Sequence, residues 1–198
     1  MGNSLMNYDK AMYKKVHNLM DEVVFSSPEE SFKVNAKNHK GKVRMPFISI
    51  WRLPDFSVNK GMYNDSYVRR GPVDKGLRGS EFPNSYINLH GLPVSLQYQL
   101  DVYATKRDVC DGLATELLLE MYENPYLDVI QTDIGEEFVQ QFNLEVEDNV
   151  SDNTSITEFD ETNRFYRLSL TVDIPEAVIY RIDKRNTIDY IDFKLDVE

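Results

Sequence analysis

The sequence has few of the residues that build metal sites and nucleophilic centres. Cys110 is the only cysteine, so the chain can form neither an internal disulfide nor a cysteine cluster. None of the histidines His17, His39 and His90 has a second histidine or a cysteine at metal-ligand spacing. Cys110 lies within an apolar helical pattern, which predicts a small buried side chain and an unreactive thiol. We therefore expect no metal site and no cofactor.

Motifs that cradle phosphate or activate a nucleophile are also absent. The chain has no Gly-x-x-x-x-Gly-Lys-Ser/Thr loop, which argues against Walker-type nucleotide hydrolysis, and no Gly-x-Ser-x-Gly elbow. The acidic stretch 145–161 is not an EF-hand loop, because Val150, Asn153 and Phe159 stand where ligands and a glycine are required; a solvated turn fits better. We expect a protein that is not an enzyme. The alternative is an active site whose groups converge only in the fold.

Long apolar runs and an excess of basic residues are missing as well. No stretch approaches the ~20 apolar residues that span a bilayer, and the N-terminus lacks the apolar core of a secretory signal. We expect a protein that is made in the cytoplasm and makes no contact with membranes. The formal net charge is −11, whereas ordinary duplex binding needs clustered Lys and Arg. The charge therefore argues against a DNA-binding function.

The chain does contain enough apolar surface for one core. Hydrophobic residues make up 41% of its 198 residues, which predicts a single domain over residues 1–198. Apolar residues recur every three or four positions from Met12 to Val23 and predict an N-terminal helix at about residues 8–25. Residues 26–42 have no period and are expected to form a loop. Residues 43–52 predict a strand. Pro46 cannot donate a ladder hydrogen bond, which favours an edge position for at least the start of this strand.

A strand and then a helix are predicted between residues 94 and 125. Apolar and polar residues alternate over 94–103, which predicts one buried and one polar sheet face and fixes the register. Thr105 and Asp108 have the spacing of a capping box, and Asn124-Pro125 stops the helix. Its predicted apolar face consists of Val109, Leu113, Leu117 and Met121, with Cys110, Ala114 and Leu118 beside them. Further strands are expected at 127–133, 138–147, 164–174, 177–182 and 188–197, with an acidic hairpin loop between the second and third.

Residues 53–93 form a long Gly/Pro-rich stretch without helical or strand periodicity. Loops beyond about 15 residues are usually functional or disordered. Five basic and four acidic residues give this loop a net charge of +1, which makes it the relatively basic feature of an acidic chain. We interpret it as a protein-docking loop; a solvated flap and a finger that stacks on single-stranded nucleic acid are the alternatives. The candidate interface residues are Lys60, Tyr63, Tyr67, Arg69, Arg70, Lys75 and Arg78.

The last predicted strand is a second candidate interface. Ile191, Phe193 and Leu195 alternate with polar residues, so this strand can add to the sheet edge of a neighbouring subunit. Pairing within the subunit's own sheet is the equal alternative.

The order of these elements carries a family resemblance. The N-terminal helix, the edge strand and the long loop are followed by the strand "VSLQYQLDVYAT", the helix "KRDVCDGLATELLLEMYENP" and the late strand "RFYRLSLTVDIPE". This arrangement resembles the tail terminator and head-tail joining (neck) proteins of tailed bacteriophages over about residues 43–174. The resemblance implies an α+β fold, a twisted, mostly antiparallel sheet with two main helices packed on it. Strand-like segments at about 175–198 extend beyond that pattern.

The resemblance also implies a function in the virion. Subunits of this family form a ring, usually a hexamer, that ends the tail tube and joins it to the head connector. The implied partners are other copies of the chain, the tail tube protein, the tail sheath and the neck proteins, after synthesis in the host cytoplasm. DNA would pass through without specific binding, because an acidic ring repels phosphate. The alternatives are a tube or baseplate subunit and, from another class, a nucleic-acid-handling accessory protein that uses the Arg-rich loop.

Overall fold

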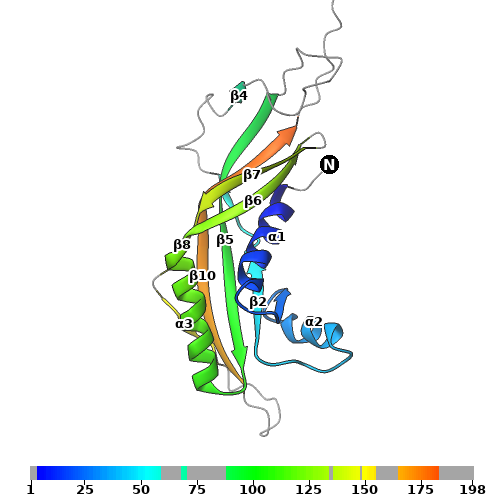
Figure 1. Ribbon diagram of the computed structural model, residues 1–198, viewed down its shortest axis with the longest axis vertical. Helices are drawn as coiled ribbons and strands as arrows, with labels where there is room; N and C mark the ends of the chain where they lie inside the picture. The colour runs from blue at the N-terminus through cyan, green and yellow to red at the C-terminus, as the bar shows by residue number, and fades with distance from the viewer. Residues whose placement is uncertain are drawn as a thin grey trace, which may run out of the picture.

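The computed structural model describes residues 4–58, 68–70, 88–133, 136–147, 149–154 and 165–182. In this part of the chain, three helices pack with an eight-stranded, mostly antiparallel sheet, so the predicted α+β class is confirmed. β5 (Asn88–Ala104) and β10 (Tyr166–Ile182) lie side by side along the long axis of the molecule (Figure 1). These two strands are the centre of the sheet.

The other strands extend this central pair on both sides. β2 (Phe47–Arg52) pairs with β5, and β1 (Val23–Phe25) continues the sheet in the parallel direction. β3 (Ser57–Val58) and β4 (Val68–Arg70) also pair with β5, while β8 (Glu145–Val146) and β9 (Ser151–Asp152) pair with β10. The antiparallel register sets Leu100 opposite Leu170, so the apolar side chains of both central strands share one face.

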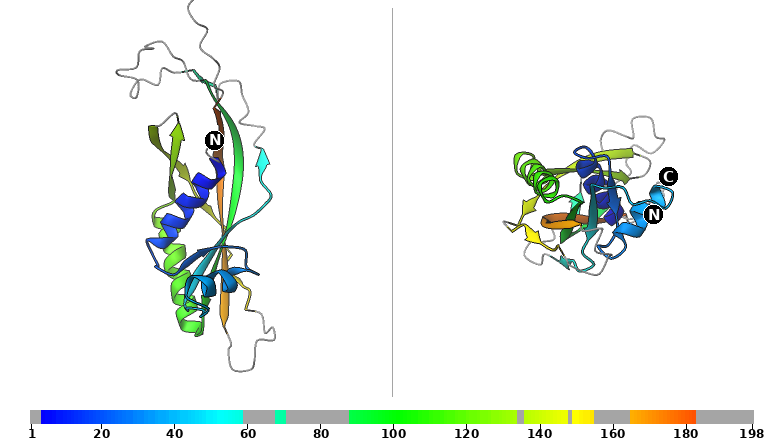
Figure 2. Two further views of the ribbon diagram at one scale, coloured as in Figure 1. Left: turned by 90° about the vertical axis from the view of Figure 1, so that its right-hand side faces the viewer. Right: turned by 90° about the horizontal axis from the view of Figure 1, so that it is seen from below.

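That apolar face is covered by α1 (Ser4–His17), α3 (Arg107–Glu123) and a hairpin of β6 (Tyr126–Asp133) and β7 (Glu136–Asn143). Figure 2 shows these elements on the same side of the sheet when it is seen edge-on. The main core lies between the two layers and includes the fully buried side chains of Met12, Leu96, Leu100, Leu117 and Leu127. The predicted apolar face of residues 94–103 is therefore confirmed.

The predicted end of the first helix and the predicted edge position of the first strand are both wrong. The first helix ends at His17, and β1 follows where the helix was expected to continue to residue 25. Val23 is buried in the main core, and Val24 is buried with Phe47 and Tyr103 in a second cluster on the other face of the sheet. A strand allows this because successive side chains point to opposite faces. β2 lies between β1 and β5 and is not an edge strand. Pro46 is tolerated because pairing begins one residue later, at Phe47.

A second helix, α2 (Ser31–Asn38), stands where a loop was expected. Phe32 and Val34 pack this helix on a cluster of Val24, Phe47 and Tyr103. The Phe32 ring centroid lies 5.4, 5.1 and 4.8 Å from those of Phe47, Tyr103 and Phe165. The buried Asn35 amide then fixes the chain that follows, because it accepts the Arg44 N–H at 2.7 Å and donates to the Arg44 carbonyl at 3.2 Å. A helix held this way gives a weak apolar period.

β5 begins six residues earlier than expected and contains Pro93 in its interior. Pro93 lies opposite Val178 in the ladder. The Val178 N–H donates to the Tyr8 hydroxyl at 2.8 Å, and the same hydroxyl donates to the Val178 carbonyl at 3.0 Å. Both polar groups of Val178 therefore face away from β5, so β10 has no need of the N–H that proline lacks. The Tyr8 hydroxyl of α1 therefore provides the hydrogen bonds that a neighbouring strand would otherwise make with Val178.

The helix α3 begins at Arg107 with Lys106 as its N-cap, and Lys106 makes no side-chain cap hydrogen bond. The predicted capping box of Thr105 and Asp108 is therefore wrong, because Asp108 falls on the second helical residue. The buried positions are Cys110, Ala114, Leu117 and Met121, while Val109 is exposed, so the core face is rotated from the predicted one. The expectation that Cys110 is buried is confirmed.

We predict that Cys110 does not react with thiol reagents in the folded protein. Its Sγ lies 3.4 Å from the Val102 carbonyl inside the core, and burial raises the pKa of the thiol. Both effects lower the concentration of accessible thiolate. Labelling with Ellman's reagent at pH 8 is expected to be negligible until denaturant unfolds the chain, after which one thiol is titrated. Rapid labelling without denaturant would contradict the structure.

The C-terminal strands are longer than the pattern predicts. Segments 164–174 and 177–182 join into one strand, β10, whose register shifts between Ile174 and Ala177. The expected strand at 138–147 divides into β7 and β8, whereas that at 127–133 is confirmed as β6. The strand expected at 188–197 lies outside the described residues.

Candidate interaction surfaces

Of the predicted interface residues, the structure describes only Arg69 and Arg70. Arg69 and Arg70 belong to β4, which pairs with Leu89 and Asn88 at the start of β5. Lys60, Tyr63, Tyr67, Lys75 and Arg78 of the loop and Ile191, Phe193 and Leu195 of the last strand lie outside the described residues. The two arginines are thus placed at one end of the long central ladder, and the docking hypothesis for the whole set stays a prediction.

The sheet face away from the main core holds a buried ionic cluster. Asp101, predicted on the polar face, is fully buried. Its two carboxylate oxygens each accept a hydrogen bond from Arg167 at 3.2 Å, and Oδ1 also accepts one from the Ser169 hydroxyl. Gln99 donates to the same carboxylate at 3.0 Å, and Asn153 donates to Ser169 at 2.8 Å. This carboxylate is saturated with donors, so the cluster ties β5, β10 and residue 153 together.

A second buried cluster joins α1 to the sheet. The Tyr98 hydroxyl donates to Asp9 Oδ1 at 2.9 Å, and Arg52 Nη1 lies 3.4 Å from the same oxygen. Burial raises the pKa of Asp9, while the Tyr98 hydrogen bond and the Arg52 charge oppose the rise. The pKa of Tyr98 is raised by burial and by the Asp9 charge. Tyr98 is fully buried and the Asp9 and Arg52 side chains are partly buried, so these groups position α1 on the sheet.

An open cavity of about 370 Å³ lies between α1 and the β6–β7 hairpin. Its walls are Asn7, Lys10, Ala11, Lys14, Asp128, Ile130 and Val139. Both lysines are exposed.

Within the described residues no group of three or more His, Cys, Asp or Glu side chains is placed to hold a metal ion. None of the helices in that part is long and apolar enough to cross a membrane.

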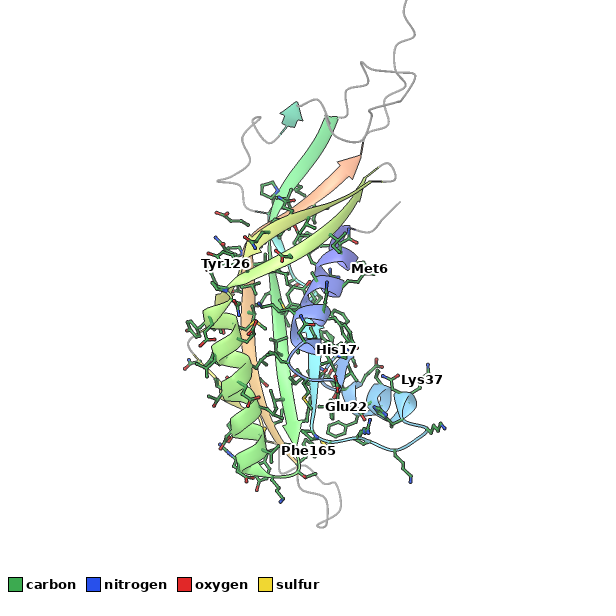
Figure 3. The ribbon with its side chains drawn as sticks, viewed as in Figure 1. Met6, His17, Glu22, Lys37, Tyr126 and Phe165 are labelled. Atoms are coloured by element: carbon green, nitrogen blue, oxygen red, sulfur yellow. The ribbon has the colours of Figure 1, made fainter. Side chains whose placement is uncertain are left out.

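The outer side of α3 and the hairpin that follows it expose apolar side chains. Leu119 and Tyr122 on α3 are 52% and 53% exposed, and Tyr126 at the start of β6 is 51% exposed. Further along the same face of β6, beyond the exposed Asp128, the exposed Ile130 pairs with Val139, which is 65% exposed, on β7. Tyr126 lies where α3 meets the hairpin (Figure 3). We name Leu119, Tyr122, Tyr126, Ile130 and Val139 the apolar strip.

Oppositely charged surfaces flank the molecule. Residues 31–44, comprising α2 and the turn after it, contain Lys33, Lys37, Lys40, Lys42 and Arg44 and no acidic residue, and all five side chains are exposed. We name them the basic flank. It is more positive than the 53–93 loop, so that loop is not the main basic feature. Charge counted in short windows would have revealed this from the sequence. The acidic flank consists of the exposed Asp108, Asp111, Glu116 and Glu123 on α3.

Gly112 lies in the middle of the exposed side of α3. A Cβ at this position would have no atom within 4 Å, so no packing requirement explains the glycine. We predict that Gly112→Ala raises the free energy of unfolding by about 0.5–1 kcal/mol, because alanine loses less backbone entropy in a helix. Urea denaturation measures this change. A loss of stability would mean that the backbone needs glycine here.

A scan against protein-family models found no match for this chain, and no curated protein matched it significantly.

Proposed function

We propose that this chain is a structural virion protein, a tail terminator or neck subunit that forms a ring on the end of the phage tail tube and joins it to the head connector. The proposal rests on the order of elements from β2 to β10, with the helix α3 directly after the long strand β5. Its partners are other copies of itself, the tube protein, the tail sheath and the neck proteins. It acts by shape and surface charge and catalyses no reaction.

The observation that carries the assembly part of this proposal is the apolar strip. Single exposed apolar residues are common, but neighbouring ones on adjacent elements mark interaction sites. Leu119, Tyr122 and Tyr126 follow one another at three- and four-residue spacing from α3 into β6, and Ile130 and Val139 extend the strip. A chain with such a surface gains stability when a partner covers it.

The strong negative charge supports the ring in particular. Each subunit carries a net charge of −11, so a closed ring of copies surrounds its channel with like charge. Phosphates are repelled from such a channel, which lets a genome pass without binding. Arg69 and Arg70 lie at one end of the central ladder, where bidentate pairing with the carboxylates of a neighbour would hold the stack of rings.

Native mass spectrometry of the purified chain tests this proposal. We expect a closed oligomer of one size, a hexamer, that survives dilution to micromolar concentration and that binds the ends of isolated tails. An open series of lengths would favour the tube or baseplate alternative, because an interface that does not close makes filaments. A monomer at every concentration, with and without tails, would contradict the proposal.

The basic flank favours a second candidate function, a nucleic-acid-handling accessory protein. The five exposed cations of residues 31–44 lie on a short helix and turn that a single strand can reach. This function predicts binding to a single-stranded oligonucleotide that weakens steeply with salt. Fluorescence anisotropy at 50 and 200 mM salt distinguishes the two candidates, since the ring proposal expects no binding at either concentration.

A further inference from the structure

We propose that the basic flank of one copy docks on the acidic flank of the next copy, so that subunits join head to tail. This inference rests on the proposed ring and names the surfaces that build it. It assigns a partner to the helix α2, which lies outside the residues of the resemblance, and to the outer side of α3.

The basic flank has cations without partners in the described part of the subunit. Glu22 already has two partners, because it pairs with Arg44 at 2.6 Å and with His39 at 2.7 Å. Lys33, Lys37, Lys40 and Lys42 are exposed, and no ion pair within the described residues uses them. The flank therefore keeps about four positive charges to offer to another molecule.

The acidic flank has the complementary excess. Asp111 pairs with Arg107 at 3.1 Å, and Glu120 lies 3.6 Å from Lys15. Asp108, Glu116 and Glu123 are exposed and have no ion pair within residues that the structure describes. Glu116 and Glu123 lie about one helical turn on either side of Leu119, which is 52% exposed, and Asp108 lies at the start of the same helix. A partner that docks here neutralises charge and covers an apolar side chain at once.

The positions of the flanks suit a repeating contact. α2 packs beside β1 at one edge of the sheet, whereas α3 packs on β10 and β8 toward the other edge. Figures 1 and 2 place α2 and α3 on opposite sides of the molecule and at the same level along its long axis. Lys37 lies on the far side of the molecule from α3 (Figure 3). One subunit cannot bring its own flanks together, but successive copies can, which is the geometry of a head-to-tail interface.

A second copy explains the basic flank better than nucleic acid does. The rest of the chain is more negative than the net charge of −11, because residues 31–44 contribute only positive charge. A polyanion that approaches α2 therefore meets strong repulsion from the remainder of the subunit. The second copy instead brings its own acidic surface into contact with a basic one and keeps the remaining charges apart. Complementary patches of this kind set specificity and register.

Charge-reversal variants in matched pairs test the inference. The first variant combines Lys33→Glu with Lys37→Glu on the basic flank, and the second combines Glu116→Lys with Glu123→Lys on the acidic flank. The reversals at 33 and 123 suit the helix macrodipole, since they set a negative charge in a first turn and a positive charge in a last turn. Asp55→Lys with Glu176→Lys is the control, because it makes the same change in net charge as the acidic-flank reversal at exposed carboxylates outside both flanks and outside the apolar strip.

We expect each reversal alone to raise the concentration for half-assembly roughly a hundredfold, as like charges then face each other. The control with Asp55 and Glu176 reversed is expected to assemble as the unmodified chain does. A one-to-one mixture of the two reversed variants should recover assembly, because each flank then meets its opposite on the other variant. Sedimentation velocity measures assembly, and circular dichroism confirms that each variant is folded.

Three outcomes overturn the inference. Reversed variants that assemble normally would show that the flanks do not meet, while a ring in the unmodified chain would leave the proposed function standing. A folded one-to-one mixture that fails to recover assembly would also show that the flanks do not meet. A basic-flank reversal that abolishes oligonucleotide binding and leaves assembly unchanged would assign α2 to nucleic acid. An unmodified chain that stays monomeric would instead contradict the proposed function itself.

Discussion

Replacing Asp101 with alanine is expected to lower the free energy of unfolding by about 3–5 kcal/mol, as breaking a buried ion pair does in other proteins. Asp101 is fully buried and accepts hydrogen bonds from Arg167, Ser169 and Gln99. Without the carboxylate, the partly buried Arg167 guanidinium keeps its charge and loses both of its acceptors. The loss should therefore exceed that of an ordinary polar residue on a sheet.

Urea denaturation of Asp101→Ala gives the size of this effect. The same substitution at Asp111, which is exposed on α3, is the control and is expected to leave the denaturation midpoint almost unchanged. A loss of less than about 1 kcal/mol at Asp101, the range of surface ion pairs, would mean that water reaches this face of the sheet in solution.

Tyr8→Phe is expected to cost about 2–4 kcal/mol, because removing one hydroxyl leaves two buried backbone groups without a partner. The hydroxyl both donates to and accepts from Val178, at 3.0 and 2.8 Å. The ring remains, so its contact with Phe142, at 5.1 Å between centroids, is kept. The change therefore isolates the hydrogen bonds from the packing.

Hydrogen exchange locates the effect of Tyr8→Phe. The Val178 amide should exchange markedly faster in the variant, whereas amides in the middle of the β5–β10 ladder should change only with global stability. Tyr13→Phe is the control, since Tyr13 is only partly buried and its described contact is ring stacking on His17. Equal stability losses for the two variants would contradict the assigned function of Tyr8.

The central ladder was predictable from the sequence because its signal is local. Alternation over residues 94–103 and again over 164–174 fixes which side chains face the core, and each strand repeats the pattern several times. The start of β5 was missed because Pro93 is an ordinary sign of a loop. What allows it is Tyr8, 85 residues earlier in the chain, and no local pattern reports such a contact.

Other misses have equally specific causes. α2 packs through Phe32 and Val34 and is fixed by the buried amide of Asn35, so its apolar face is too small to give a helical period. β1 was assigned to a helix because Val23 also fits the spacing of α1. Burial of Asp101 on the supposedly polar face follows from Arg167, which lies on the neighbouring strand β10 but 66 residues later in the chain. Tertiary partners decided each of these positions.

The sequence predicted a basic surface, but it did not predict which residues form it. A search for basic clusters led to the 53–93 loop, although residues 31–44 carry more positive charge over a shorter stretch. The apolar strip required the structure, because the sequence did not show that Leu119 and Tyr122, which lie outside the predicted apolar face, are exposed beside Tyr126. Once Cys110, Ala114, Leu117 and Met121 are seen to be buried, the opposite side of α3 is left for a partner.

Zero-length cross-linking of isotope-mixed protein tests most directly whether this molecule acts by assembling with its own copies through α2 and α3. Unlabelled and nitrogen-15-labelled chains are mixed, allowed to assemble and treated with a carbodiimide, which couples lysine amines to carboxylates in contact. We expect peptides that join Lys33 or Lys37 to Glu116 or Glu123, with one unlabelled and one labelled half. Cross-links at these positions only within one isotope, or none in a chain that remains monomeric, would contradict the account.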